Sequence, residues 1–332
     1  MKRESIAKIS AVGITVVLVA ILLSQIQISN ITATLTGIDP LYLIAGFVLY
    51  IGIYTLRALR FYILLNREVR LRDLFNIVCV HNMVNNILPA RTGELSYIYL
   101  LKKLHNKDTG DGIATLFIVR IFDLTTIALL FFLSALMIRD LPEIITLAVW
   151  GIATFLMLIV IFVIVLLYSG KSFLNVVKKF FGMINLKMSF VDYLLRKGGE
   201  VVKSFEKIKT NGKSVILSSI TISFGIWLSL YLLSYILLKA MNIDLGYFAV
   251  VLASTFAVLT MVLPIQGIGG FGTLESGWAI GFVAIGLTKE VAISSGFGYH
   301  IIIWIYFLVL GCYGFLAMKS GAPTKRLISR NP

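Results

Sequence analysis

Long uninterrupted apolar runs constrain this chain more than any other feature. One of them extends from Leu147 to Tyr168 and holds no ionisable side chain before the final tyrosine. At a helical rise of about 1.5 Å per residue, some 20 apolar residues cross a hydrocarbon core of about 30 Å. Only 14% of the residues are charged, against about 25% in soluble domains. The sequence therefore predicts a single polytopic, all-α integral membrane domain over residues 1–332.

The apolar stretches divide into full and broken segments. Two stretches, 74–103 and 246–287, are each interrupted by a Leu-Pro dipeptide, in LPARTGE at 88–94 and in LPIQGIGGFG at 263–272. The run at 6–28 is too long for a signal-peptide core and lacks a small-x-small cleavage site, so it is predicted to be a retained span. Six full transmembrane helices are predicted, at 6–28, 41–65, 112–138, 144–168, 214–238 and 291–318.

The positive charges predict the orientation. If each broken stretch is a re-entrant hairpin that returns to its own side, one side of the membrane holds 26 of the 30 lysines and arginines. The positive-inside rule makes that side cytoplasmic, and both termini lie on it. We expect the plasma membrane, and no nucleic acid as partner despite the net charge of +14, because the basic residues lie in loops beside apolar runs.

The same arrangement predicts an inverted repeat. Each half, about 41–138 and 214–318, would consist of a span, a broken hairpin and a second span, and the two hairpins would open to opposite sides of the membrane. Discontinuous helices at corresponding positions of inverted halves indicate a transporter-like site near the midplane. The intervening residues 169–213 are basic and amphipathic, which fits helices on the cytoplasmic membrane surface or a solvated linker.

The first break offers candidate ligands for a headgroup. Irregular backbone at membrane depth is tolerated only where it is buried in protein or lines a watery cavity. Arg91 lies in the break and Glu94 follows three residues later, so the pair would share a helical face. Asn85 and Asn86 precede the break. These asparagines would bind either a polar headgroup or the unpaired backbone.

Arg120 and Asp123 are a second charged pair, well inside the span at 112–138. Insertion scales assign about 2.5–3.5 kcal/mol to each such charge at the centre of a span. Two explanations stay open: an arginine that binds phosphate and is oriented by the acid, or a self-neutralising i, i+3 bridge without a ligand.

The second break supplies Gln266, Gly269, Gly270 and Glu275 as further candidate substrate-binding residues. Glycines allow the backbone to approach a ligand closely, and they also allow close helix packing. Nothing in the sequence has the spacing of a catalytic or metal site, so we predict neither catalytic residues nor a metal nor a cofactor. The sequence does not favour an enzyme.

These motifs resemble one known family. The two breaks, together with Arg120 and Asp123, look like the lysylphosphatidylglycerol synthase transmembrane-region (UPF0104) family, over about residues 5–320. The resemblance implies a flippase-like membrane domain, since the related region of the bacterial multiple-peptide-resistance factor flips aminoacylated phosphatidylglycerol, and similar regions accompany archaeal glycosyltransferases. Residues 266–268 depart from the usual Pro-Gly-Gly pattern. No aminoacyl-transferase domain follows the last span, so we do not expect the chain to make lysyl-lipid alone.

Three functions stay open at this point. The first is a lipid flippase or transporter whose partners are membrane phospholipids with an anionic or aminoacylated headgroup. The second is a membrane scaffold or regulator of a separate lipid- or glycan-modifying enzyme. The third is a membrane-embedded lipid transferase.

Overall fold

The computed structural model describes residues 3–88, 93–138, 141, 143–183, 199, 213–262 and 267–320. These residues form helices and no strand, which confirms the predicted all-α class. In chain order the elements are α1 (Arg3–Leu23), α2 (Ile28–Thr36), α3 (Pro40–Leu64), α4 (Leu71–Ile87), α5 (Glu94–His105), α6 (Thr109–Met137), α7 (Glu143–Met183), α9 (Lys213–Ala240), α10 (Tyr247–Val262), the short 3-10 helix η2 (Ile268–Gly270), α11 (Thr273–Ala284) and α12 (Lys289–Ser320).

Among the described residues, four helices are long and apolar enough to cross a membrane, α3, α6, α9 and α12, and the bent pair of α1 and α2 would be a fifth span if counted as one. The four helices confirm the spans predicted at 41–65, 112–138, 214–238 and 291–318. The start of α3 shows how the sequence sets a boundary: Pro40 occupies the first helical position, and the Asp39 carboxylate accepts a hydrogen bond from the Leu41 amide at 2.8 Å. The chain is thus a multi-pass membrane protein.

The first and fourth predicted spans differ from the structure. The helix predicted at 6–28 ends at Leu23, and a bend of 85° separates it from α2. Ser24 Oγ and Gln25 Nε2 both donate to the Ile21 carbonyl at this bend, where the helix ends. The helix predicted at 144–168 continues as α7 to Met183, with non-helical dihedrals at Ser169. Most of the predicted linker, at 184–198 and 200–212, lies outside the described residues.

Each broken stretch contains two short helices packed on one another. The first pair is α4 and α5, of 17 and 12 residues, and the second is α10 and α11, of 16 and 12 residues. The breaks themselves, 89–92 and 263–266, lie outside the described residues. The glycine-rich turn that follows the second break has φ of 64° at Gly269 and 79° at Gly272, values that favour glycine. Re-entry from one side of the membrane stays a prediction.

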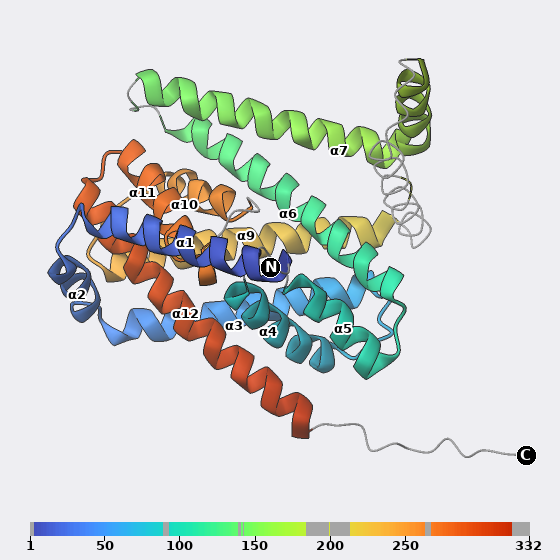
Figure 1. Cartoon of the computed structure of the whole chain (residues 1–332), viewed down its shortest axis with the longest axis horizontal. Helices are drawn as coiled ribbons and strands as arrows, with labels where there is room; N and C mark the ends of the chain where they lie inside the picture. Colours follow the sequence, from blue (N-terminus) through green and yellow to red (C-terminus); the bar gives the residue numbers. More distant parts are fainter. Residues whose placement is uncertain are drawn as a thin grey trace, which may run out of the picture.

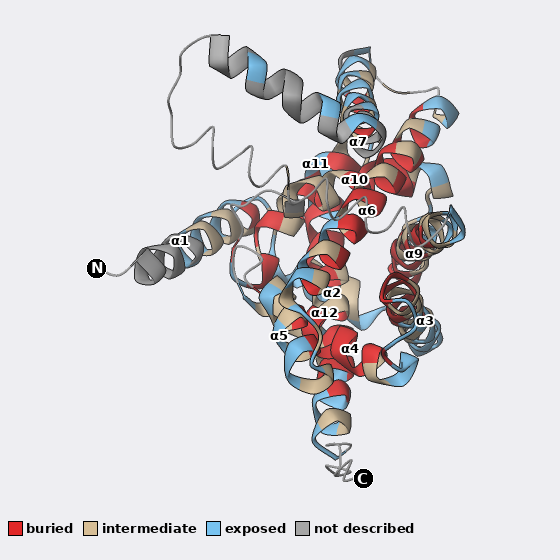
Figure 2. Cartoon of the chain, turned by 90° about the vertical axis from the view of Figure 1, so that its right-hand side faces the viewer, coloured by how far each residue is buried: buried red, intermediate tan, exposed pale blue. Residues whose placement is uncertain are grey.

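Helices α4, α9 and α10 contact most of the bundle: α3, α5, α6, α11 and α12 each pack against at least one of them. In Figure 1, α12 crosses α4, α3 lies along α9, and α6 runs between α7 and α9. In Figure 2 the buried residues concentrate on α4, α6, α9, α10 and α11, whereas α1 and α7 lie at the periphery. The largest core cluster combines side chains of α3, α4, α5, α6, α9 and α12. Elements far apart in the sequence thus share one core.

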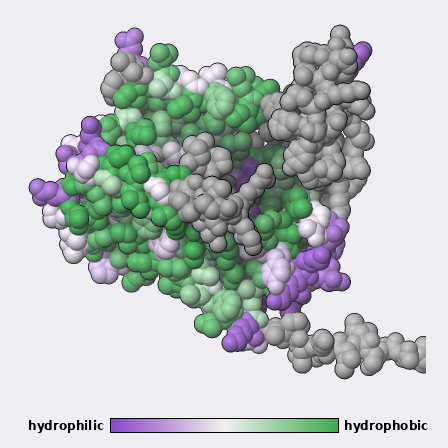
Figure 3. All heavy atoms as spheres, viewed as in Figure 1, coloured by the Kyte–Doolittle hydropathy of each residue, from purple (hydrophilic) through white to green (hydrophobic). Residues whose placement is uncertain are grey.

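The outer surface is largely apolar. Large side chains such as Leu41, Leu147 and Leu217 are 68%, 76% and 68% exposed. Figure 3 shows one face of the molecule, on which hydrophobic side chains predominate and hydrophilic ones gather toward the left edge and the lower right. An apolar surface of this extent fits contact with lipid.

Candidate functional site

A cavity of about 270 Å³ lies among α3, α4, α6, α9, α10, α11 and α12. Four charged side chains line it, and all four belong to candidate membrane spans: Arg57, Arg60, Arg120 and Asp123. Charges within spans are expensive and typically face a bundle interior or a watery space. The remaining polar lining comprises Tyr50, His81, Asn82, Asn85, Asn86, Trp227, Tyr231, Ser234, Ser254 and Tyr299.

Asp123 is the centre of a network that joins three helices. Arg60 of α3 donates to both carboxylate oxygens, at 2.5 and 3.2 Å, and its exposed fraction is 2%. Trp227 Nε1 of α9 donates to Asp123 Oδ1 at 3.0 Å. Arg60 also donates to Ser223 Oγ at 2.7 Å. A bidentate arginine–carboxylate pair of this kind fixes position as well as charge, so it holds α3, α6 and α9 together.

Arg120 pairs with Glu94 rather than with Asp123. Arg120 Nη2 donates to Glu94 Oε1 at 2.5 Å, and the side chains are 40% and 28% exposed. The contact joins α6 to the start of α5. Arg120 and Asp123 therefore do not pair with each other: residues three apart share a helical face, but each acid meets an arginine of another helix. The contact of Arg120 with Glu94 is compatible both with a structural role and with ligand binding.

The start of α5 packs tightly on α4. A Cβ added at Gly93 would lie 2.3 Å from Asn85 Cα, so only glycine fits there. The close approach carries Glu94 to Arg120, and Ser96 Oγ donates to the Gly93 carbonyl at 2.6 Å. His81 of α4 lies 3.2 Å from Ser96 Oγ through its Nδ1. Gly93 thus positions the charged start of α5.

Arg57 differs from the other two arginines of the lining. Its Nη1 donates to Asn82 Oδ1 at 2.6 Å, and among the described residues no carboxylate lies within ion-pair distance of it. The Asn82 amide in turn donates to the Val78 carbonyl at 2.8 Å. The Arg57 guanidinium also lies 5.8 Å from the centroid of the Tyr54 ring. The Arg57 charge therefore meets only neutral groups among the described residues, and it is the cationic group of the lining best able to accept an anion.

Three lining residues hold buried polar atoms without partners among the described residues, and one of these atoms is the donor Arg60 Nε. Within the described part of the chain, Asn85 Oδ1 and Ser254 Oγ are buried and make no hydrogen bond. Asn86, in contrast, donates through Nδ2 to the Asn82 carbonyl at 2.8 Å. A buried polar atom without a partner is destabilising by about 1–3 kcal/mol. Asn85 Oδ1 and Ser254 Oγ are thus available to a polar ligand.

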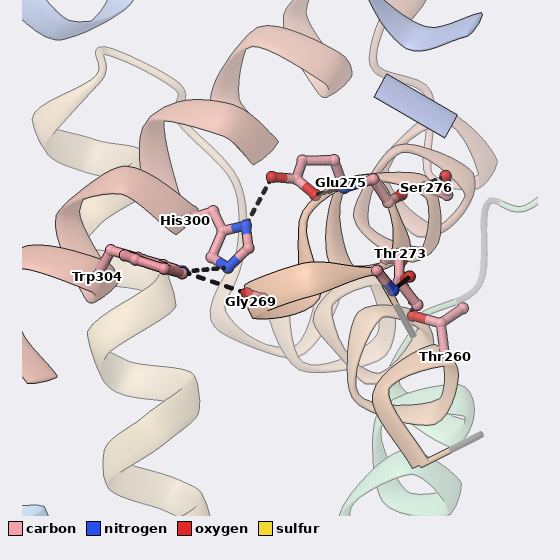
Figure 4. Close-up of polar contacts among 9 residues, drawn as sticks. Thr260, Gly269, Thr273, Glu275, Ser276, His300 and Trp304 are labelled. Atoms are coloured by element: carbon pink, nitrogen blue, oxygen red, sulfur yellow. Dashed lines mark hydrogen bonds and ion pairs between the residues drawn. The ribbon is translucent and has the colours of Figure 1, made fainter. Parts of the chain in front are cut away.

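A second polar network involves the glycine-rich turn (Figure 4). Glu275, with no exposed surface, lies with Oε1 2.6 Å from His300 Nδ1, and its Oε2 accepts from the Gly272 amide at 2.8 Å. Trp304 Nε1 donates to His300 Nε2 at 3.1 Å and to the Gly269 carbonyl at 3.2 Å. Because His300 Nε2 accepts, the ring proton lies on Nδ1, facing Glu275. The turn is thereby fastened to α12.

Further contacts fix the backbone of this turn. Thr273 Oγ1 accepts from the Gly267 amide at 3.0 Å, and Thr15 Oγ1 of α1 accepts from the Ile268 amide at 2.6 Å. A Cβ at Gly269 would lie 2.2 Å from a ring carbon of Trp304. These glycines therefore serve helix packing and backbone geometry.

The predicted site residues fall into three groups. Of the ten, the lining includes Asn85, Asn86, Arg120 and Asp123, with Glu94 bound to Arg120. Gly269, Gly270 and Glu275 lie in or beside the network of the glycine-rich turn, outside the cavity lining. Arg91 and Gln266 lie outside the described residues.

Sequence analysis missed Arg57 and Arg60. Both fall inside the span predicted at 41–65, three residues apart, but in the charge count they belong to the cytoplasmic side and neither is named as a candidate site residue. Their position within an apolar span was the signal that could have identified them. In the part of the chain that the structure describes, no cluster of histidine, cysteine and acidic residues is suited to a metal ion.

The fold and site define a class: a multi-pass helical membrane protein with a charged cavity between its spans. The chain belongs to the lysylphosphatidylglycerol synthase TM region family, whose model matches residues 8–311. It is 30% identical over 195 residues to a UPF0104 membrane protein of Methanocaldococcus jannaschii, covering 58% of this chain and 75% of that protein. A UPF0104 membrane protein of Methanothermobacter thermautotrophicus is 25% identical over 296 residues, covering 84% and 86%.

A further relative has a named activity. The glycosyltransferase AglD of Haloferax volcanii is 26% identical to this chain over 302 residues, which cover 82% of this chain and 48% of AglD. The chain thus spans about half the length of AglD.

Proposed function

We propose that this protein is a lipid flippase or transporter that moves a phospholipid or a lipid-linked headgroup between the leaflets of the plasma membrane. The observation that carries the proposal is the cavity, because four charged side chains line it from within membrane spans. A lipid headgroup that crosses the hydrocarbon core needs polar and charged partners along its way, and its acyl chains can stay in lipid.

Helix packing supports an inverted-repeat transporter. The contact of α4 with α12 has a counterpart in that of α10 with α6, and the contact of α4 with α5 has one in that of α10 with α11. The contact between α3 and α9 would relate the two halves directly. Matching contacts between corresponding helices are expected if 41–138 and 214–318 are inverted copies that enclose a site. In this arrangement both termini are cytoplasmic.

The arginines have distinct proposed roles. Arg57 and Arg120 bind the phosphate of the headgroup, since the described contacts of Arg57 are to neutral groups, the Asn82 amide and the Tyr54 ring, and Arg120 is 40% exposed. Arg91 adds a third cation near the break between α4 and α5. Asp123 and Glu94 orient their arginine partners.

Reconstitution tests the proposal. Proteoliposomes that contain fluorescent phospholipid are treated with an impermeant quencher, and the rate of leaflet exchange is measured. We expect exchange by the wild type, and a loss of at least tenfold for Arg57→Gln and Arg120→Gln, because each removes a charge-assisted hydrogen bond. Arg70→Gln is the matched control, since the Arg70 side chain is 86% exposed. Exchange by the wild type no faster than in empty liposomes would refute transport.

The AglD similarity favours a second candidate, a membrane partner of a glycan- or lipid-modifying enzyme. In that case a transferase co-purifies with the chain in stoichiometric amounts, and Arg57→Gln leaves the activity of that transferase unchanged. Turnover of a lipid substrate by the purified chain alone would instead identify it as a transferase.

A further inference from the structure

We infer that the cavity selects a lipid with one phosphodiester charge and an otherwise uncharged, hydroxylated headgroup, in preference to an aminoacylated, cationic one. This inference rests on the proposed function and names its substrate class. Three observations on the lining carry it: the balance of charge, the unpartnered polar atoms and the volume.

The charge balance leaves one positive group without a carboxylate partner. With histidine neutral, the described ionisable groups at the cavity are three arginines and, counting Glu94 beside Arg120, two carboxylates. Asp123 neutralises Arg60, and Glu94 neutralises Arg120. Arg57 remains, held by the neutral Asn82 side chain at 2.6 Å.

A phosphodiester matches this surplus. It carries one negative charge, and a guanidinium binds phosphate oxygens through two parallel N–H bonds. A lysylated glycerol headgroup adds two ammonium groups to that charge and becomes a net cation. Such a cation would approach a lining that is already positive, where like charges repel strongly because little water screens them. Charge therefore disfavours the aminoacylated lipid.

The unpartnered polar atoms fit hydroxyl groups. Asn85 Oδ1 on α4 and Ser254 Oγ on α10 are buried, line the same cavity and have no hydrogen bond within the described residues. An amide oxygen accepts a hydrogen bond, and a serine hydroxyl donates one and accepts others. A polyol such as glycerol or a sugar offers donors and acceptors to both, so its binding would satisfy groups that are otherwise desolvated without a partner.

The volume fits a headgroup without its acyl chains. At about 270 Å³ the cavity lies just below the roughly 300–1,000 Å³ of typical small-molecule pockets. A phosphoglycerol group is smaller than most ligands of such pockets, whereas a lysyl ester nearly doubles its number of heavy atoms. Size and charge therefore favour the same class of headgroup.

Binding to the purified protein in detergent tests the inference separately from transport. Native mass spectrometry measures the affinities of phosphatidylglycerol, zwitterionic phosphatidylethanolamine and lysyl-phosphatidylglycerol with identical acyl chains. We expect phosphatidylglycerol to bind about tenfold or more tightly than either of the others, the ratio that one hydrogen bond to a charged group gives. Equal affinities, or tighter binding of the lysylated lipid, would overturn the inference. A failure of transport with this preference intact would overturn only the proposed function.

Soluble glycerol phosphate serves as a probe for the source of the headgroup. If it binds as tightly as phosphatidylglycerol, the ligand is a soluble phosphate compound and the lipid assignment is wrong. We expect binding at least a hundredfold weaker, since the acyl chains contribute apolar contact along the spans.

Two variants examine the charge directly. Arg57→Gln should reduce the preference for phosphatidylglycerol by about tenfold, whereas Arg70→Gln should leave it unchanged. Asn85→Asp keeps the shape of the side chain and cancels the surplus charge, so the preference should fall even if the Arg57 variant does not fold. A preference that persists in a folded Asn85→Asp protein contradicts the charge argument.

Discussion

Removal of the Asp123 carboxylate is the sharpest test of the structure. In Asp123→Asn, the Arg60 guanidinium, 2% exposed, would lose its negatively charged partner and one of the two oxygens that accept its hydrogen bonds. Breaking a buried pair by removing one partner is destabilising by about 3–5 kcal/mol, because it leaves a buried charge uncompensated. The Trp227 indole donates to Oδ1, which asparagine keeps, so this contact adds nothing to the loss. We therefore expect Asp123→Asn to lower the free energy of unfolding by about 3–5 kcal/mol.

A double-mutant cycle separates this pair from its surroundings. Arg60→Met should be about as destabilising as Asp123→Leu, since each variant leaves the other charged side chain buried without its ionic partner. The combined variant removes both charges and should lose only about 2 kcal/mol, from the Ser223 and Trp227 contacts. The summed losses of the two single variants would then exceed the loss of the double variant by at least about 4 kcal/mol, and this difference is the coupling free energy of the pair. Unfolding is followed by circular dichroism during titration of the purified protein from mild detergent into dodecyl sulfate.

The exposed pair of Arg70 and Asp73 is the control. Its Nε–Oδ2 distance is 3.0 Å, but the arginine is 86% exposed, so its coupling should be at most about 1 kcal/mol. Polar contacts between membrane helices average about 0.6 kcal/mol in measured cycles. A coupling between Arg60 and Asp123 below about 1 kcal/mol would therefore place this pair among ordinary polar contacts and refute the network joining α3, α6 and α9.

Three further predictions use other parts of the chain. Gly93→Ala should lower the free energy of unfolding by about 1–3 kcal/mol, because the added Cβ would lie 2.3 Å from Asn85 Cα. Gly52→Ala is the control and should be neutral or stabilising, because a Cβ added at this helical position meets no atom within 4 Å. Equal losses in the two variants would contradict the close packing of α4 and α5. Glu275→Gln should lower the free energy of unfolding by about 1–3 kcal/mol, because the glutamine NH2 group, a donor, would then face another donor, either the Gly272 backbone N–H or His300 Nδ1–H. The measurement is the same dodecyl sulfate titration, and a change below about 0.5 kcal/mol would exclude this hydrogen-bond assignment. Cysteines introduced at Lys102 and Lys213 should react with an impermeant maleimide from the same side of sealed vesicles, as the re-entrant hairpin requires; reaction from opposite sides would exclude both the hairpin and the inverted halves.

The spans were predictable because each depends on local composition. Predominantly apolar stretches of more than 20 residues predicted α3, α6, α9 and α12 to within a few residues. The end of α1 was not predictable, because only Ser24 and Gln25 interrupt the apolar run there. Their side chains donate hydrogen bonds to the Ile21 carbonyl, where the helix ends. A hydropathy pattern averages over such short polar interruptions, so it merged the end of α1 with the start of α2.

The pairing of charges was not predictable from spacing. An i, i+3 separation places Arg120 and Asp123 on one helical face, but a carboxylate also responds to arginines on neighbouring helices, and their distance depends on tertiary packing. Arg60 is 63 residues from Asp123 in sequence, and Glu94 is 26 from Arg120. Only the packing of α3, α5 and α6 brings these partners together.

The contrast among the arginines explains why the cavity suits a ligand. A charge in a span is tolerated when a partner compensates it, and Arg60 has that partner in Asp123, whose two carboxylate oxygens accept from both of its Nη atoms. Because the charge of this pair is compensated, the pair serves to hold helices together. Arg57, whose described contacts are to the Asn82 amide and the face of the Tyr54 ring, keeps its charge only partly compensated. A site that binds and releases an anion needs a partly compensated arginine such as Arg57, held in place by a rigid ion pair such as that of Arg60 and Asp123.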